Sequence, residues 1–376
     1  MKCMKPIKVL EVIRQGQIGG GESHVLDLIR GFASNEVEPI AMAFTPGQMI
    51  DTLEAEGVRC YVIETDKAFD LKIQQRIKKV IEKEQIDIIH AHGSRAASNV
   101  FLLAKQMHLP MIYTVHGWSF HQDQPWLMRK LRAWSEKLIC HYSKKVICVS
   151  ESNRMTGEEV FGLKNAVVIE NGINLKRFNP DKELKDIRQE LGINKDEFII
   201  GFIARITLQK APLDFIKSVA LAYKENPRIK GLLVGEGDMR DEVYVYIREH
   251  NLEDCFYLSK FRTDVPDLLS AIDVYCLPSL WEGLSIALLE AMAMRKALVV
   301  TPTDGTKELI VNHKNGIIVD FNSPESLAKA YLRYLQEPEL IKQYGTETQT
   351  IIQKRFNSQR VSDEVTEIYK ELSTNI

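Results

Sequence analysis

Two glutamates in the second half of the chain lie in or beside apolar segments, where burying a carboxylate costs free energy unless a partner donates hydrogen bonds to it. Glu282 follows the apolar run Val274–Leu277, and Glu290 lies within the apolar stretch that starts at Ile286. A buried carboxylate needs groups that donate hydrogen bonds to it, and ribose hydroxyls do so without neutralising its charge. We therefore expect Glu290 to bind a ribose and Glu282 to lie nearer a reacting sugar. An internal salt bridge of Glu290 is the alternative.

Two cations follow another apolar run. Arg205 and Lys210 come after Phe198–Ile203, which has the composition of a buried strand. Arginine binds a diphosphate through two parallel hydrogen bonds, and lysine acts on it as a point charge. This pair predicts a diphosphate site at the carboxyl end of a strand. A pair of solvated surface charges is the alternative.

The glycine run Gly19–Gly21 follows the first apolar run, Ile7–Ile13, and opens an amphipathic stretch. Glycines let backbone N–H groups approach a phosphate, and a helix N-terminus favours an anion. The run lacks the G-x-G-x-x-G pattern, and no acid stands about twenty residues later to bind a ribose. A plain strand-to-helix turn is therefore the alternative to a phosphate site.

Histidines at strand ends raise the question of a metal. His90, His92 and His116 lie at or just past the ends of predicted strands. No carboxylate or cysteine accompanies them at a recognised ligand spacing, so the sequence predicts no metal site and no cofactor. For His92, a structural role or a contact with an acceptor stands beside catalysis.

The segment Trp126–Leu138 is basic, aromatic and amphipathic. Such a helix is typical of a surface that touches anionic lipid. An ordinary helix with a solvated basic side is the alternative.

The elements that must position these residues alternate along the chain between short β-branched runs and amphipathic segments, which is typical of parallel α/β sheets. The predicted strands are Ile7–Ile13, Pro39–Phe44, Val58–Ile63, Ile86–His90, Met111–Val115, Lys145–Val149, Val167–Ile169, Phe198–Ile203, Gly231–Val234, Cys255–Leu258, Val274–Leu277, Ala297–Val300 and Gly316–Val319. A loop without periodicity, Asn171–Pro180, separates two such series. We expect two doubly wound domains that face each other across a cleft, with their ligands beyond the carboxyl ends of the strands.

Length and composition fit this organisation. The chain has 376 residues, enough for two cores, and its net charge of −2 argues against a nucleic-acid partner. Its N-terminal residues do not resemble a signal peptide, and no stretch approaches the ~20 apolar residues of a membrane span. The six cysteines are scattered, as expected for free thiols in a reducing compartment. We expect a cytoplasmic protein, peripheral on the inner face of the plasma membrane if the basic helix binds lipid.

Taken together, the motifs resemble those of the glycosyltransferases of family 4, which have the GT-B fold and retain the anomeric configuration. The two glutamates are separated by seven residues, with Pro-Ser before them and Ala-Met-Ala after them. The other matching segments are Gly19–Gly21, Ile89–Gly93, Thr114–Trp118, Cys148–Ser152, Glu170–Ile173, Arg205 with Lys210, and Gly235–Gly237. Each is weak alone. In this order they are specific, and they cover essentially the whole chain.

The resemblance implies roles around the donor phosphates. Gly20 and Gly21 would approach the donor diphosphate from the N-terminal domain. Arg205 and Lys210 would neutralise the diphosphate as it leaves. His116 matches the family's histidine beside the donor sugar.

The resemblance also implies roles around the nucleoside and the transferred sugar. Glu290 would hold the ribose, and Glu282 the hydroxyls of the sugar. The backbone amides of Gly283–Ser285 would complete the sugar and phosphate contacts, and the base would lie near Phe261. The implied domains are an acceptor-side domain at 1–178, a donor-binding domain at 179–356, and a C-terminal helix at 357–376 that packs back on the first domain.

Three departures from the family pattern limit the identification of the donor. Leu284 and Ser285 stand where many relatives have Phe and Gly. Arg295 and Lys296 replace a usual glycine, and Gly305-Thr306 stands where a double glycine is common. None of these removes a charged group that the chemistry needs.

The expected activity is transfer of a hexosyl group, with retention, from a nucleoside diphosphate sugar to a hydroxyl of a lipid-linked or polysaccharide glycan. A sugar-nucleotide epimerase or a sugar phosphorylase of the same fold is the alternative among enzymes. A two-lobed sugar-binding protein is the non-enzyme alternative.

Overall fold

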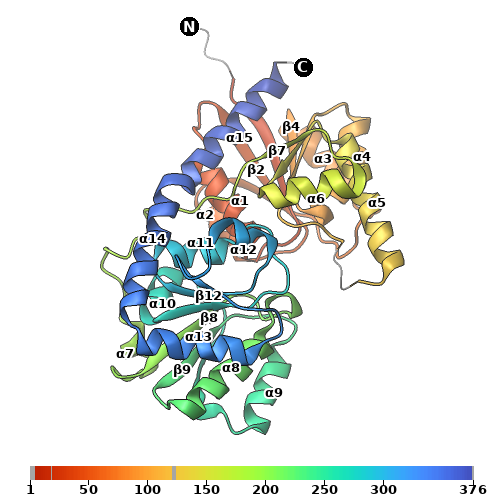
Figure 1. Cartoon of the computed structure of the whole chain (residues 1–376). Helices are drawn as coiled ribbons and strands as arrows, with labels where there is room; N and C mark the ends of the chain where they lie inside the picture. Colours follow the sequence, from red (N-terminus) through yellow and green to blue (C-terminus); the bar gives the residue numbers. More distant parts are fainter. Residues whose placement is uncertain (1–4, 18, 121–123, 375–376) are drawn as a thin grey trace. The chain divides into compact units, whose positions relative to one another are not determined.

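The computed structural model describes residues 5–17, 19–120 and 124–374. The described chain forms two compact units (Figure 1). Unit 1 runs to Gly172 and resumes at Ser358, whereas unit 2 comprises Ile173–Asn357. Each unit is an α/β sandwich with its own parallel sheet.

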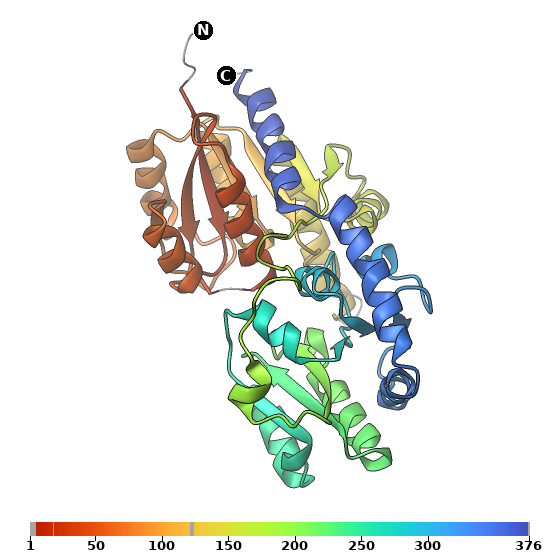
Figure 2. The same ribbon diagram turned by 90° about the vertical axis from the view of Figure 1, so that its left-hand side faces the viewer.

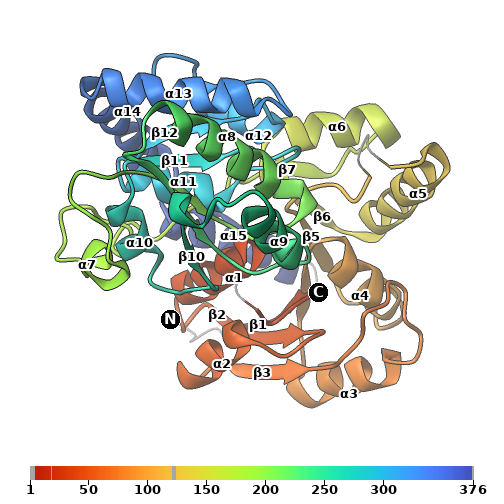
Figure 3. The same cartoon turned by 90° about the horizontal axis from the view of Figure 1, so that it is seen from below.

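The sheet of unit 1 is parallel throughout, in the order β3-β2-β1-β4-β5-β6-β7. Its strands are β1 (Ile7–Ile13), β2 (Val37–Ala43), β3 (Arg59–Val62), β4 (Ile88–His92), β5 (Met111–Val115), β6 (Lys145–Cys148) and β7 (Ala166–Val168). Figure 3 shows β1, β2 and β3 side by side, with β3 at the edge. The strand order reverses between β1 and β4, and doubly wound sheets bind ligands beyond the carboxyl ends of the strands at such a reversal.

Helices cover both faces of this sheet. They are α1 (Gly20–Gly31), α2 (Gln48–Ala55), α3 (Gln74–Glu84), α4 (Ser94–Gln106), α5 (Trp126–Tyr142), α6 (Glu151–Phe161) and α15 (Ser358–Ser373). One face packs on α3, α4 and α5 through residues such as Ile77, Val100 and Ile139. The other face packs on α1, α2 and α15.

The C-terminal helix α15 is part of the core of unit 1, although it follows unit 2 in the sequence. Its apolar residues recur at helical spacing, as in Val361, Val365 and Ile368, and they pack on β1, β4 and β5. A Cβ atom added to Gly31 of α1 would lie 2.1 Å from Ser362 Oγ, so this glycine lets α15 approach closely. The blue helix beside the C-terminus in Figure 2 is α15.

The sheet of unit 2 is also parallel, in the order β10-β9-β8-β11-β12-β13, with its reversal between β8 and β11. Its strands are β8 (Phe198–Ile203), β9 (Ile229–Val234), β10 (Phe256–Ser259), β11 (Val274–Leu277), β12 (Ala297–Val300) and β13 (Ile317–Ile318). Its helices are α7 (Ile187–Leu191), α8 (Pro212–Glu225), α9 (Arg240–Glu249), α10 (Val265–Ala271), α11 (Ile286–Ala293), α12 (Asp304–Leu309), α13 (Pro324–Gln336) and α14 (Glu339–Arg355), with short 3-10 turns at Leu208–Lys210 and Glu253–Cys255.

One core of unit 2 lies between the sheet and α8, α9 and α13. Phe215 of α8 and Tyr331 of α13 are fully buried there, and the Tyr331 hydroxyl donates to Cys276 Sγ at 2.9 Å. Figures 1 and 3 show α8 and α13 side by side. On the carboxyl side, the loops after β8 and β11 leave neighbouring strands, so the residues that they carry meet at one edge.

Every strand predicted from the sequence is present, with its ends shifted by at most two residues. The described cysteines are free thiols, and Cys3 lies outside the described residues. None of the helices in the described ranges combines the length and hydropathy that a membrane crossing requires.

Candidate active site

Lys210 and Glu282 meet at the switch point of the unit 2 sheet. Lys210 ends the turn after β8, and Glu282 lies in the loop after β11. Lys210 Nζ forms an ion pair with Glu282 Oε1, and both side chains are about a tenth exposed, at 10% and 9%. Ser279 Oγ donates to the same Glu282 oxygen at 2.7 Å. The largely buried charges are therefore paired and hydrogen-bonded, as burial of an ion pair requires.

Backbone contacts tie the loops that carry this pair. Gln209 Nε2 donates to the Trp281 carbonyl oxygen at 2.8 Å, and the Leu280 N–H donates to the Gln209 carbonyl oxygen at 2.8 Å. The two loops are thus joined directly beside the ion pair, through the side chain and the backbone of Gln209. The ammonium assigned to a diphosphate is thus held in place by the carboxylate assigned to a sugar.

Arg205 projects from the same edge and is exposed to solvent. Its loop is held by the segment after β9, because the Ile206 N–H donates to the Glu236 carbonyl oxygen at 2.9 Å. A Cβ atom added to Gly237 would lie 2.1 Å from the Ile206 carbonyl oxygen, so only glycine permits this approach. Arg205 is therefore an exposed side chain on a loop that backbone contacts hold, where a bound anion could reach it.

Glu290 is partly exposed and lies on α11, the helix that follows the loop of Glu282. Both carboxylates lie within electrostatic reach of Tyr275 on β11. Burial raises the pKa of Tyr275 well above its usual value, and the charges of Glu290 and Glu282 raise it further. The two glutamates therefore share one side of the switch point, and their negative charge suits ligand hydroxyls that donate hydrogen bonds.

The loop before α11 presents its backbone. Leu284 and Ser285 are buried, and Ser285 makes no side-chain capping bond within the described residues. The first N–H groups of a helix have no acceptor within the helix, so this end of α11 suits an anion. A Cβ atom added to Gly305 would lie 1.7 Å from the Gly283 carbonyl oxygen, so α12 holds this loop in place only because residue 305 is glycine.

The loop between β10 and α10 offers an aromatic surface. Phe261 is 38% exposed. The neighbouring Arg262 is engaged, since its guanidinium pairs with Glu190 and Asp264. The exposed ring is therefore the part of this loop that a planar base could stack against.

In unit 1, the predicted phosphate and histidine positions adjoin. Gly20 begins α1 after β1, and among the described residues no atom lies within 4 Å of a Cβ atom added to it. A Cβ atom added to Gly21 would lie 3.7 Å from Cδ2 of His116. The structure thus brings Gly21 to His116 in unit 1, and Lys210 to Glu282 in unit 2.

A buried polar network behind His116 was not predicted from the sequence. Glu11 of β1 is fully buried and accepts hydrogen bonds from His92 Nε2 at 2.8 Å and from the Tyr369 hydroxyl at 2.7 Å. Burial alone would raise the pKa of Glu11, but its interactions with His90 and His92 lower it below its usual range. The available signal was an acid within an otherwise apolar strand. Its partners, including Tyr369 on α15, were unknowable from spacing.

Comparison with known proteins identifies the family. Residues 18–177 match the family model described as Glycosyltransferase Family 4, and residues 184–350 match the model described as Glycosyl transferases group 1. The chain is 27% identical over 341 residues to the UDP-Gal:alpha-D-GlcNAc-diphosphoundecaprenol alpha-1,3-galactosyltransferase of Escherichia coli, covering 88% of each chain.

Two further proteins are similar along most of their length. The alpha-monoglucosyldiacylglycerol synthase of Acholeplasma laidlawii is 23% identical, with 86% of this chain and 82% of that one covered. The crystal structure of Anabaena HepE in complex with UDP and glucose matches with a TM-score of 0.86 at 20% identity. The match covers 97% of this chain and 100% of the HepE chain. Because this family consists of enzymes, the comparison excludes the alternative of a two-lobed sugar-binding protein. The chain belongs to glycosyltransferase family 4 and is a glycosyltransferase with the GT-B fold.

Proposed function

We propose that this enzyme transfers a hexosyl group from a nucleoside diphosphate sugar to a hydroxyl of a lipid-linked or polysaccharide glycan, with retention at the anomeric carbon. The observation that carries the proposal is the Lys210–Glu282 pair at the switch point of unit 2. It places a cation for a diphosphate directly beside a carboxylate for sugar hydroxyls. Glu290, on the next helix, supplies the carboxylate for the ribose.

In the proposed reaction the bond between the anomeric carbon and the diphosphate oxygen breaks. The acceptor oxygen forms a bond to that carbon on the same face, and its proton passes to the departing phosphate oxygen. Arg205, Lys210 and the N–H groups at the start of α11 stabilise the negative charge that grows on the diphosphate, which is the main contribution of the protein. His116 and the glycines Gly20 and Gly21 of unit 1 are assigned to the donor sugar and its phosphates.

Uridine nucleotides are the first donors to test, because the names of the E. coli relative and of the HepE complex specify UDP-galactose and UDP. At a hundredfold excess over its dissociation constant, a donor should stabilise the protein by about 2.7 kcal/mol. We expect the melting temperature to rise by roughly 5–10 °C in a thermal-shift screen of nucleoside diphosphates and their sugars.

The ligands that stabilise the protein then enter an activity assay. Transfer should require an acceptor hydroxyl. Conversion of the nucleotide sugar without any acceptor would identify an epimerase, and a requirement for inorganic phosphate would identify a phosphorylase. If no nucleoside diphosphate or nucleotide sugar changes the melting temperature, the donor site is wrongly assigned.

A lipid-linked acceptor is supported by a surface of unit 1. The name of the E. coli relative includes a diphosphoundecaprenol, and that of the Acholeplasma relative a glucosylated diacylglycerol as its product. The N-terminal half of α5, at the outer edge of unit 1 in Figure 1, exposes large apolar side chains. These are Trp126, Leu127, Met128, Leu131 and Trp134, which are 46–65% exposed. Exposed apolar groups on this scale cost free energy in water and suit a lipid interface.

Cations are interspersed with these apolar groups. Lys130 lies over the ring of Trp126, with Nζ 4.8 Å from the ring centroid, and Arg129 is exposed beside it. Arg132 is partly engaged, because its Nη1 donates to the Ser119 carbonyl oxygen at 3.0 Å. We propose that this face of α5 binds anionic lipid at the membrane surface where the acceptor lies.

We expect the enzyme to float with anionic vesicles in low salt and less so in high salt, which screens the charges. Replacing Arg129, Lys130 and Lys137 by serine should weaken flotation on phosphatidylglycerol vesicles and leave the melting temperature unchanged. This triple variant spares Arg132 and its backbone contact.

The matched control replaces Lys72, Arg76 and Lys79, which are also exposed in unit 1 but lie away from α5. It removes the same charge and should float like the wild type. Equal flotation of the two triple variants would show that the basic side of α5 is only solvated.

A further inference from the structure

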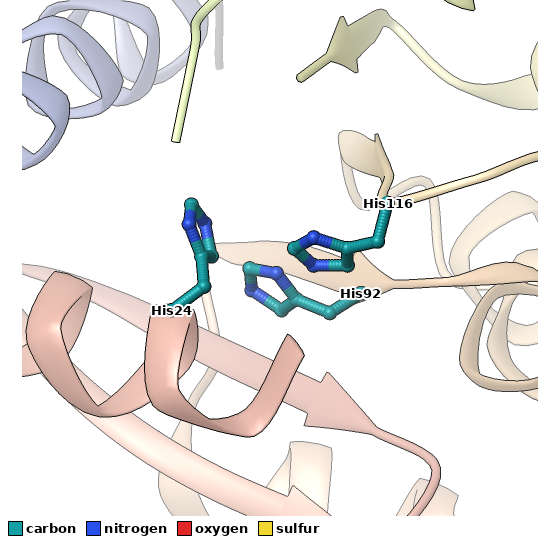
Figure 4. Close-up of side chains that lie close together, drawn as sticks. All are labelled: His24, His92 and His116. Carbon is teal, nitrogen blue, oxygen red and sulfur yellow. The ribbon is translucent and has the colours of Figure 1, made fainter. Parts of the chain in front are cut away.

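Three of the described histidines gather at the carboxyl edge of unit 1, each from a different element. His24 lies on α1, His92 ends β4, and His116 follows β5 directly. One ring nitrogen of each lies within 4.8 Å of those of the other two. The ring centroids are 4.9 Å apart for His24 and His116, and 5.7 Å apart for each other pair. Figure 4 shows His24 facing His92 and His116 across a shared space.

Two nitrogens of this cluster are buried without a hydrogen bond. They are Nδ1 of His92 and Nε2 of His116, for which the described part of the chain offers no partner. A buried polar atom that lacks a partner is rare in folded proteins and indicates a missing ligand, ion or water. His116 is itself partly exposed, so the cluster is accessible from solvent.

Glu11 determines which nitrogen of His92 is available. A carboxylate only accepts hydrogen bonds, so His92 Nε2, 2.8 Å from Glu11 Oε2, must carry the proton. In a neutral ring the other nitrogen, Nδ1, then has a free lone pair. A histidine held by a carboxylate on one side and open on the other is the arrangement that proteins use behind metal ligands.

Metal ligation requires a neutral imidazole, and the Glu11 carboxylate behind His92 would offset part of the charge of a cation.

We propose that His24, His92 and His116 bind a divalent ion of the zinc class. Tetrahedral Zn²⁺ holds its nitrogen ligands at 2.0–2.1 Å, which places them about 3.3 Å apart. From 4.8 Å the nitrogens need approach by at most about 1.5 Å, within reach of side-chain rotation. The fourth position would stay open on the exposed side of His116. Imidazoles favour Zn²⁺, Co²⁺ and Ni²⁺ over Mg²⁺ and Ca²⁺, which prefer oxygen ligands.

A second cluster nearby, Glu11 with His90 and His92, is a poorer site. Its members are fully buried, and their polar atoms bond one another. His90 Nδ1 lies 2.6 Å from the Tyr369 hydroxyl, and His90 Nε2 lies 2.7 Å from Thr114 Oγ1. An ion would have to break these bonds without a path from solvent. Glu11, His90 and His92 therefore form a hydrogen-bonded layer behind the three-histidine site and are not themselves the proposed metal site.

The proposal goes beyond the proposed transfer reaction, which uses no metal, and an ion held by His116 would compete with the donor sugar that is assigned to the same residue. It also departs from the expectation of no metal, which considered ligand spacing along the sequence only. Failure of metal binding would leave the donor assignments of unit 2 untouched, because the two are tested by different ligands.

The test uses the full-length chain, treated with EDTA and desalted. We expect it to bind one Zn²⁺ in calorimetry and to give the visible absorption of tetrahedral Co²⁺ on titration. His24→Gln should weaken binding at least about a hundredfold, since loss of a supporting residue alone costs 10–100-fold. Glu11→Gln, which changes a supporting residue, should weaken Zn²⁺ binding by about 10–100-fold. The matched control, His250→Gln, removes an exposed histidine of unit 2 and should bind as the wild type does.

X-ray absorption of the zinc-loaded wild type keeps the proposal testable if His24→Gln fails to fold. It should show three imidazole nitrogens around the ion. A chain that binds neither Zn²⁺ nor Co²⁺, an ion with two or fewer imidazoles, or equal affinity of His24→Gln and His250→Gln would each overturn the site.

Discussion

Replacing Arg205 by alanine is expected to lower kcat by about 10²–10³-fold, the usual effect of removing a group that stabilises developing negative charge. Charge grows on the diphosphate only as the sugar leaves, so loss of this cation should affect the transition state more than the bound donor. Arg205 is exposed and its loop is held through backbone contacts, so the variant should fold normally. The measurement is steady-state kinetics together with the affinity for the bare nucleoside diphosphate.

Two variants sharpen this result. Arg205→Lys keeps the charge but loses the paired hydrogen bonds, and should fall between the wild type and Arg205→Ala. Arg248→Ala removes an exposed arginine from α9 of the same unit and should retain full activity. A fall in nucleotide affinity as large as the fall in kcat/KM, with kcat unchanged, would show that Arg205 only binds the donor.

Lys210 should behave differently from Arg205, because it is buried against Glu282. Its removal leaves a largely buried carboxylate without its cation, which is destabilising as well as inactivating. That Lys210 is buried and Arg205 exposed could not be predicted from the sequence. Both follow the same strand in the sequence, but only the fold places Lys210 beside the loop after β11.

The order of elements was predictable because apolar runs and amphipathic segments alternate without interruption. The strand order within each sheet comes from the structure, and it is this order that brings the turn of Lys210 to the loop of Glu282. Strand ends shifted by up to two residues, as in β4, which runs to His92 rather than His90. Such shifts arise because the end of a strand depends on its partner, which local sequence does not specify.

Long-range polar contacts were beyond prediction for a related reason. Glu11 and Tyr369 are separated by almost the whole chain, yet the Tyr369 hydroxyl bonds the Glu11 carboxylate. His24 joins His92 and His116 only because α1, β4 and β5 end at one edge of the sheet. The search for ligands at fixed spacing cannot find residues that three separate elements bring together. A single acid within an apolar strand was the one local sign of this network.

Alanine variants of the two glutamates should differ in which kinetic constant they change, kcat or the donor KM. Glu290 is assigned to a ribose that stays the same throughout the reaction, so Glu290→Ala should mainly raise the donor KM, by about 10–100-fold for a charged hydrogen bond of ~1.5–3 kcal/mol. Affinity for the bare nucleoside diphosphate should fall by the same factor. Glu282→Ala should lower kcat and raise the donor KM together, because its carboxylate is assigned to the sugar that is transferred.

The ion pair makes the comparison between these variants decisive. Lys210 is paired with Glu282, so Glu282→Ala releases its ammonium to the diphosphate. Affinity for the bare nucleotide should therefore stay equal or rise while transfer collapses, and Glu282→Gln should keep the Ser279 contact but release Lys210 in the same way. Isothermal titration with the nucleoside diphosphate and with its sugar measures both effects. If Glu290→Ala binds the bare nucleotide normally while Glu282→Ala does not, the roles of the two glutamates are reversed.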